Sequence, residues 1–262
     1  MQKFILSVCL TILIAGTQAV AQNVVYDANA QVRKVDHFTK VNVSSAITLY
    51  LSQGKEEAVA VSAGDEKFTA RIRTEVRDGV LKIYVENGAW NSWNWGNRKL
   101  KAYVTIVDID GLHASGASSV KVSDPLKARN NFDLEVSGAS TVKFDGGVTA
   151  GKIDMQIDGA SNFRSSVTAD DVKVNLSGAS QADVSGKSGG LNIEASGASG
   201  FNGYGLETEN CTAEASGAST VRITVNKKLD AQASGASGID YKGDAVITNL
   251  NVSGASNVKK RS

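Results

Sequence analysis

The chain has 262 residues, of which 42% are hydrophobic, enough to bury a sizeable core in one large or two small domains. Its 26 Gly, single Pro and 6% aromatic residues favour tight turns and small side chains over a helical bundle. The 28 basic and 27 acidic residues give no bias toward nucleic acid or an anionic membrane, so nucleic acid is not an expected partner.

Residues 1–21 have the pattern of a secretory signal peptide. Lys3 precedes an apolar run from Phe4 to Gly16, and the small-x-small sequence at 19–21 is typical of a cleavage site. The run is shorter than the roughly 20 residues that span a bilayer, which disfavours a membrane anchor. We therefore expect an exported protein that begins at Gln22 and lies in the periplasm, on the outer membrane surface or outside the cell. Its lone cysteine, Cys211, would leave it without an internal disulfide.

Residues 22–110 are expected to form a β-rich N-terminal region that caps or begins a longer array. Residues 41–51 alternate between apolar and polar positions, which is the period of a strand. Between Thr74 and Ile83, the dipeptide Asp78-Gly79 separates two alternating runs and predicts a β-hairpin. The terminal unit of a repeat array must differ from the internal ones, because an exposed end would otherwise recruit another edge.

The segment 88–98 contains all three Trp residues of the chain, interleaved with Asn and Ser. Aromatic faces beside amide and hydroxyl groups can stack on sugar rings and hydrogen-bond their hydroxyls, and Trp is also favoured in protein interfaces. The alternative is that the rings fold back and plug the open end of the β-core, and their spacing does not distinguish the two. The candidate ligand-binding residues are Trp90, Asn91, Trp93, Asn94, Trp95 and Arg98.

A four-residue motif, Ser-Gly-Ala-Ser, recurs through residues 111–262. It begins at Ser115, Ser137, Ser177, Ser196, Ser216, Ser234 and Ser253, and a further copy, Asp-Gly-Ala-Ser, begins at Asp158. Successive copies start 22, 21, 19, 19, 20, 18 and 19 residues apart, which indicates a repeat architecture. The sequence at 44–47, Ser-Ser-Ala-Ile, has the same place in an alternating run and is interpreted as a degenerate ninth copy.

The residues around each motif also alternate with the period of a strand. When the first residue of the motif is position 0, positions −3, −1, +5 and +7 are usually apolar, as in Leu134, Val136, Val142 and Phe144. This parity places the Gly at +1 and the Ser at +3 on the inward side. We expect each motif to turn the chain between two short strands, with the inward Ser hydroxyls stacked and hydrogen-bonded along the array.

These features together predict an all-β fold, a parallel β-solenoid with about 20 residues per coil. Turn-rich segments at 145–147, 185–190 and 202–205 separate the units, and no helical periodicity interrupts them. At ~4.8 Å per stacked strand, eight coils would make a rod roughly 40 Å long. A β-propeller would need about twice this repeat length, and the strands of a β-sandwich would not share one motif.

The sequence also resembles a known family. The signal peptide, the run Phe-Thr-Lys-Val-Asn-Val at 38–43, the turn Asp-Gly-Val-Leu-Lys-Ile at 78–83, the Trp-bearing segment and the serial Ser-Gly-Ala-Ser motifs are together similar to the putative auto-transporter adhesin, head GIN domain family of secreted Gram-negative proteins. The resemblance covers roughly residues 30–258. It implies a right-handed β-helix at the cell envelope or surface with an adhesive role, and it brings no catalytic residues.

A polysaccharide-active lyase or hydrolase is the alternative, because parallel β-helices also host such enzymes. Glycoside hydrolysis needs paired carboxylates, for which Asp154 with Asp158 or Asp170 with Asp171 are available. However, Asp158 only replaces the first Ser of a motif, and the sequence places Asp170-Asp171 in a turn, where Asp is common. The sequence has no Cys/His cluster. Its G-x-S-x-G match at 186–190 falls in a turn-rich segment with no helical pattern after it, so it is not a nucleophile elbow. We therefore expect no enzymatic activity, no cofactor and no metal.

The sequence thus predicts an exported binding or structural module of the cell envelope, with a surface glycan or an envelope protein as its partner. The outward Ser and Ala of the motifs form a regular array that could order water, but the sequence lacks the Thr-x-Thr columns expected of an ice-binding face. Contact between solenoid ends could produce a homo-oligomer, which the basic tail Lys259-Lys260-Arg261 would discourage at one end.

Overall fold

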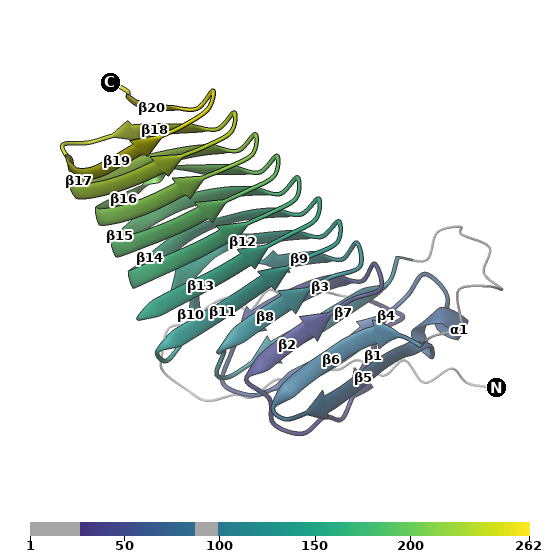
Figure 1. Ribbon diagram of the computed structural model, residues 1–262. Helices are drawn as coiled ribbons and strands as arrows, with labels where there is room; N and C mark the ends of the chain where they lie inside the picture. Colours follow the sequence, from purple (N-terminus) through teal and green to yellow (C-terminus); the bar gives the residue numbers. More distant parts are fainter. Residues whose placement is uncertain (1–26, 87–98) are drawn as a thin grey trace, which may run out of the picture.

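The computed structural model describes residues 27–86 and 99–262. The predicted signal peptide, residues 1–21, lies outside this part of the chain. Within the described residues, no helix is both long and apolar enough to cross a membrane. Figure 1 shows a rod of stacked coils that rises from the N-terminal to the C-terminal end.

Nearly all of the regular structure is β. The single helix within the described ranges, α1 (Glu66–Thr69), has four residues. The strands are β1 (Gln31–Arg33), β2 (Lys40–Val43), β3 (Thr48–Gln53), β4 (Ala58–Ser62), β5 (Ile72–Arg77), β6 (Val80–Val85), β7 (Lys101–Ile106), β8 (Gly111–Ala114), β9 (Ser119–Val122), β10 (Leu126–Lys127), β11 (Asn131–Val136), β12 (Thr141–Thr149), β13 (Lys152–Ile157), β14 (Asn162–Leu176), β15 (Gln181–Ala195), β16 (Gly200–Ala215), β17 (Thr220–Ala233), β18 (Gly238–Lys242), β19 (Val246–Val252) and β20 (Asn257–Lys260).

Each coil has two long sides that meet at the Ser-Gly-Ala-Ser turn. The strands that precede the turns pair in parallel and form one side, which we call face A; it contains β2, β8, β11, β13, the second halves of β14–β17, and β19. The strands that follow the turns form face B, from β3 through β9, β12 and the first halves of β14–β17 to β18 and β20. A short third segment closes the coil, where Leu126, Val148 and Val167 stack in register. The predicted parallel solenoid is confirmed.

The structure confirms the turn at the motif but corrects the predicted direction of its glycine. Ser140, at +3, is fully buried, whereas Gly138, at +1, is exposed and has a φ of 72°. The prediction assumed that side chains alternate between inward and outward through the whole motif, but the left-handed glycine interrupts this alternation. Several of the buried hydroxyls hydrogen-bond to the backbone of a neighbouring coil: Ser180 Oγ donates to the carbonyl of Ile157 at 3.0 Å, and Ser237 Oγ to that of Ala215 at 2.9 Å. Those of Ser118 and Ser199 have no partner among the described residues.

Adjacent turns stack closely, which explains why the +1 position is glycine. The amide of Ala179 donates to the carbonyl of Gly159 in the preceding turn at 2.7 Å. A Cβ added to Gly178 would lie 2.5 Å from that same carbonyl oxygen, and its φ of 69° disfavours other residues as well. The degenerate copy makes an equivalent turn, with Ser45 at 66° and Ala46 at 58°, and its strands β2 and β3 pair with β8 and β9. The ninth copy is confirmed.

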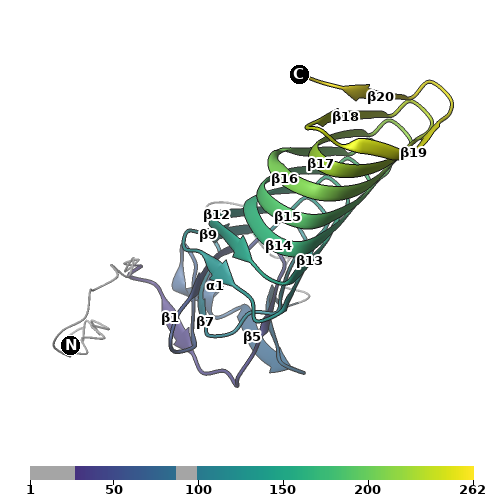
Figure 2. The ribbon, with the colours of Figure 1, turned by 90° about the vertical axis from the view of Figure 1, so that its left-hand side faces the viewer.

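At the N-terminal end, antiparallel strands close the parallel stack. Strands β6 and β7 add one more layer to faces A and B, below β2 and β3. Beyond them, β5 pairs antiparallel with β6, β4 with β7, and β1 with β4. The predicted hairpin is confirmed, because Asp78 (φ 52°) and Gly79 (φ 72°) join β5 to β6. Figure 2 shows β1 and β5 at this end of the rod and β19 and β20 at the other.

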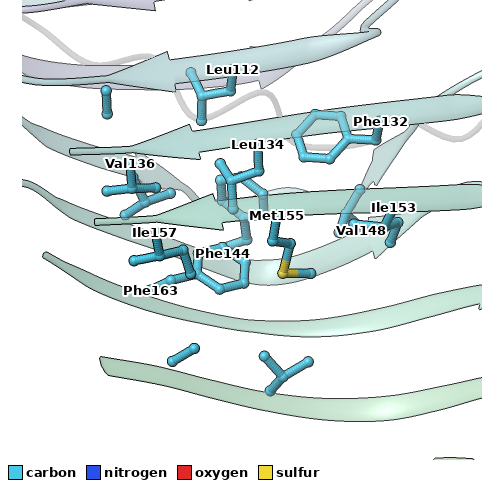
Figure 3. Packing of buried hydrophobic residues seen from close by; sticks show 14 of the residues in the cluster. Leu112, Phe132, Leu134, Val136, Phe144, Val148, Ile153, Met155, Ile157 and Phe163 are labelled. Atoms are coloured by element: carbon cyan, nitrogen blue, oxygen red, sulfur yellow. The ribbon is translucent and has the colours of Figure 1, made fainter. Parts of the chain in front are cut away.

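The core consists of columns of inward side chains, one from each coil. Leu112, Leu134 and Met155 stack in register behind face A (Figure 3). The rings of Phe144 and Phe163 meet edge to face at a centroid distance of 5.6 Å. Toward the C-terminal end the inward side chains of face A become small. The last two inward positions are alanine in both β16 (Ala213 and Ala215) and β17 (Ala231 and Ala233).

A partly buried ionic network fastens the first described residues to the sheet. Lys101 Nζ lies 2.9 Å from Asp27 Oδ2, and the Tyr103 hydroxyl donates to the same oxygen at 2.8 Å. Burial raises the pKa of Asp27, but hydrogen bonds from Lys101, Tyr103, the Asn29 amide and Ser62 outweigh it and lower this pKa to about 2.

Changing Asp27 to Asn should remove an acid-sensitive part of the stability. The folded pKa lies below the ordinary 3.8, so ionised Asp27 stabilises the folded state near neutral pH, and this contribution is lost as the pH falls from about 4 to about 2. Denaturant unfolding measured over this pH range should show a smaller decline for Asp27→Asn than for the wild type. Glu56→Gln, which removes an exposed carboxylate, is the control, and an equal decline in all three proteins would contradict the assignment.

Replacing Gly178 by Val should destabilise the solenoid by about 1–3 kcal/mol, because the turn requires a left-handed backbone with no Cβ. Chemical denaturation measures the loss. Ala179→Val adds bulk one residue later in the same turn, at an exposed position outside the left-handed region, and should cost much less. Equal stability of Gly178→Val and the wild type would refute this account of the turn.

Candidate functional site

Face A presents an ordered column of polar side chains at position −2 of each motif. Neighbouring members lie in register on adjacent parallel strands, about 4.8 Å apart. We call this the amide–carboxylate column. Its members are His113, Glu135, Gln156, Asn175, Glu194, Glu214, Gln232 and Asn251.

A shallow groove of about 530 Å³ follows the C-terminal part of this column, beside the turns. We call it the turn-edge groove. One wall is the column from Gln156 to Asn251, and the other is the first residue of each of six successive motifs, from Asp158 to Ser253. Side-chain amides, carboxylates and hydroxyls therefore repeat along the groove at the pitch of the solenoid, each able to accept a hydrogen bond and all but the carboxylates able to donate one.

The carboxylates of the turn-edge groove differ in their surroundings. Asp158 Oδ1 accepts hydrogen bonds of 2.6 Å from the Ser177 hydroxyl and from the Gly159 amide, and these lower its pKa. Glu194 and Glu214 are register partners on β15 and β16, and neither forms an ion pair within the described residues. Two like charges on adjacent strands repel each other, so the sheet gains no stability from holding them there.

Closer to the N-terminal end, face A contains two ion pairs. A second hollow there is lined by Lys40, Lys82, His113, Asp133 and Glu135 among others. Lys40 Nζ contacts Asp133 at 2.9 Å, and His113 Nδ1 contacts Glu135 at 2.9 Å. In the turn-edge groove, by contrast, Glu194 and Glu214 have no ion-pair partner among the described residues.

The predicted Trp site lies in residues 87–98, outside the described part of the chain. Trp90, Asn91, Trp93, Asn94, Trp95 and Arg98 all belong to it. The strands before and after this segment are described: β6 belongs to face A, and β7 belongs to face B of the same layer. The amide of Ser44 donates to Ile83 and that of Thr48 to Leu100, on either side of the degenerate turn. In sequence, this segment thus joins face A to face B, as the motifs do in the coils.

The carboxylate pairs considered for catalysis do not form a shared site. The Asp158 carboxylate is occupied by its turn, while Asp154 lies in β13 on the outward side of face A. Asp170 and Asp171 lie within β14 rather than in a free turn, at the bend where the pairing with β15 skips one residue. In that coil the parallel pairing between β14 and β15 continues on both sides of the bend, although the polar composition of the segment predicts a loop.

Metal and thiol chemistry have no candidate in the described ranges. No cluster of three or more His, Cys, Asp or Glu residues there is suited to hold a metal ion. Cys211 is free and buried, and burial, together with the charge of Asp230, raises the pKa of its thiol. A protonated, buried thiol is a core residue and not a nucleophile.

Comparison with known proteins gives a family and a fold. A model of the family described as putative auto-transporter adhesin, head GIN domain matches residues 37–245. No curated protein matches the chain significantly. Among solved structures, a putative adhesin from Parabacteroides distasonis has a TM-score of 0.77 at 18% identity, covering 88% of this chain and 96% of its own.

Two further structures have the same fold. A putative lipid binding protein from Parabacteroides distasonis has a TM-score of 0.74 at 22% identity, covering 89% of this chain and 97% of its own. A putative adhesin from Bacteroides fragilis has a TM-score of 0.66 at 20% identity, covering 88% and 96%. At these identities the likeness shows the fold alone.

The repulsion between Glu194 and Glu214 can be measured. Glu214→Gln should increase the free energy of unfolding by less than about 1 kcal/mol at low salt, and the increase should shrink as salt is added. Denaturant titrations at two ionic strengths test this. Glu207→Gln, whose carboxylate faces Lys187 at 3.9 Å, is the matched control and should bring no increase. A loss of stability in Glu214→Gln would mean that this carboxylate has a structural role.

Proposed function

Because the chain belongs to the putative auto-transporter adhesin, head GIN domain family, we propose that it is an exported, adhesin-like module that binds an extended glycan along face A. The observation that carries the proposal is the turn-edge groove, in which six successive coils present the same kinds of hydrogen-bonding group in register. An adhesin family agrees with export to the cell surface, as the predicted signal peptide does.

The chemistry of the groove matches that of a sugar polymer. Side-chain amides and carboxylates hydrogen-bond pairs of sugar hydroxyls, and the motif serines offer further donors and acceptors. The rungs are about 4.8 Å apart, which is close to the length of one pyranose in an extended β-linked chain. Successive sugars could therefore contact successive coils, and each contact would contribute a small part of the affinity.

The charge of the groove favours some glycans over others. Its lining contains Asp158, Glu194 and Glu214 and no Lys, Arg or His. Uronic acids or sulfated sugars would be repelled by these carboxylates. Neutral glycans and those with amino sugars fit the groove better, because hydroxyl and ammonium groups both donate hydrogen bonds to carboxylates.

Trp90, Trp93 and Trp95, with Asn91, Asn94 and Arg98, extend this proposal as a second contact region. Their segment follows β6, whose Lys82 lies in register with Asn42 of face A. In this proposal their indole rings stack on sugar rings of the bound glycan. Because these residues lie outside the described part of the chain, their role is tested separately from that of the groove.

The names of the structural relatives offer a second ligand class, which face A supports less well. One relative is named a putative lipid binding protein. A lipid-binding surface needs a continuous apolar lining, whereas most residues that line the turn-edge groove carry amides, carboxylates or hydroxyls, and the apolar ones among them alternate with these. Neither the family nor these relatives are described as enzymes, in agreement with a binding role.

A glycan array tests the proposal with a matched pair of variants. Gln156→Ala with Asn175→Ala removes two adjacent rungs of face A, and Asn162→Ala with Gln181→Ala removes the same residue types from adjacent coils of face B. The wild type should bind neutral, β-linked glycans, and the face A variant should bind them at least about tenfold more weakly, a loss of about 1.4 kcal/mol. The face B variant should bind like the wild type.

The variant with Trp90, Trp93 and Trp95 all changed to Ala is measured on the same array. Weaker binding by a folded triple variant would support the aromatic contact region, and unchanged binding would remove the Trp residues from the proposal while leaving the groove. If folded wild-type protein binds no glycan on the array, or if the face A and face B variants lose binding equally, the groove is not a glycan site.

A further inference from the structure

At the C-terminal end of the rod, strand β19 has exposed apolar side chains and an unpaired edge, which are features of a strand that another strand covers. Of the five exposed large hydrophobic residues in the described ranges, four lie on β19: Val246, Ile247, Leu250 and Val252, which are 68%, 37%, 52% and 44% exposed. β19 pairs only with β17 among the described strands, so its other edge has free backbone amides and carbonyls. Figure 2 shows this strand at the end of the stack.

The sizes of the inward residues point the same way. Leu250 continues the column of Ala213 and Ala231, and Val252 continues that of Ala215 and Ala233. The side chains therefore become larger on the strand that ends the stack. Terminal coils that face water are expected to become polar instead, because larger apolar groups there only increase the apolar area in contact with solvent.

Two of the other end strands are protected by charge. At the N-terminal end, β5 has Arg73, Glu75 and Arg77 along its length and pairs with β6 alone. On face B of the C-terminal end, β20 contains Lys259 and Lys260. Charged residues, above all Lys, are a common protection of exposed edges against pairing. β19, with the sequence Val-Ile-Thr-Asn-Leu-Asn-Val, contains no charge at all.

We propose that β19 pairs with β19 of a second copy of this chain, antiparallel and across a two-fold axis. An uncharged edge is complementary to itself under such an axis, whereas a charged one would face its own charge. The basic tail does not oppose the approach, because Arg261 pairs with Asp240 at 3.1 Å and Lys260 lies 3.8 Å from Asp244. The third cation of the tail, Lys259, has no ion-pair partner in the described ranges, but it lies on β20 of face B and not on the face A edge of β19.

Pairing through β19 would join the two A faces into one sheet. The amide–carboxylate column ends at Asn251 in each copy, so the two columns would meet at the axis and the polar surface would double in length. This consequence rests on the proposed function, but the dimer does not, and it is measured without any glycan.

The mass of the purified protein in solution tests the interface. Sedimentation velocity over about a hundredfold range of concentration should show a monomer that becomes a dimer. Leu250→Asp places a charge on β19, at the open end of the inward column, and should remain monomeric; its side chain is half exposed, so the fold should tolerate the change, which the free energy of unfolding checks. Asn192→Asp adds the same charge to face A within the stack, at an exposed position on β15, and should dimerise like the wild type.

Hydrogen exchange locates the contact. In the wild type, amides of β19 should become more protected as the concentration rises, while those of β20 should not, and Leu250→Asp should abolish the change. A wild type that stays monomeric at every concentration would overturn the proposal. So would a dimer that Leu250→Asp leaves intact, or one whose concentration-dependent protection lies elsewhere.

Discussion

The whole rod depends on how closely one Ser-Gly-Ala-Ser turn can lie on the next. At each level the amide of the motif alanine donates to the carbonyl of the glycine in the preceding turn, at 2.7 or 2.8 Å from Ala160 through Ala255. That contact leaves no room for a Cβ on the glycine above, which also needs a positive φ. These hydrogen bonds between successive turns therefore fix the pitch of one edge of the solenoid. They also set the register of the strands on both sides of the turns.

The rest of the coil absorbs the unequal lengths of the repeats. Motif starts are 18 to 22 residues apart, yet faces A and B stay in register next to the turns. The pairing shifts instead lie farther along the coil, between Phe144 and Val148, Asp183 and Ser185, and Gly203 and Glu207. Insertions are cheapest where the chain already bends and bulges can form. The turn edge is thereby kept regular, and the outward residue at −2 can change without disturbing the core.

Much of this architecture follows from the sequence, because apolar alternation and a repeated turn motif are local signals. They predicted the parallel coils, the degenerate copy at Ser44 and the hairpin at Asp78-Gly79. The direction of Gly138 was wrong, since parity does not survive a left-handed residue. The turn-edge groove was missed although the polar residue at −2 was visible in every repeat: a column exists only when the register of all strands is known, and unequal repeats hide that register. The Trp segment stays a prediction, as does the division of the chain at residue 110.

Regularity at the turn edge has a consequence for binding. A groove built from one residue per coil offers a repeating ligand many near-equivalent positions, so each further coil adds a contact at high effective concentration. No single rung then needs to be strong, and substitutions at one level weaken binding only partly. The unpaired Glu194 and Glu214 are the exception to this uniformity, because they keep a repulsion that the fold does not need. The other column positions along the groove are the neutral Gln156, Asn175, Gln232 and Asn251. The like-charge pair between them marks the part of the groove where the ligand is expected to matter most.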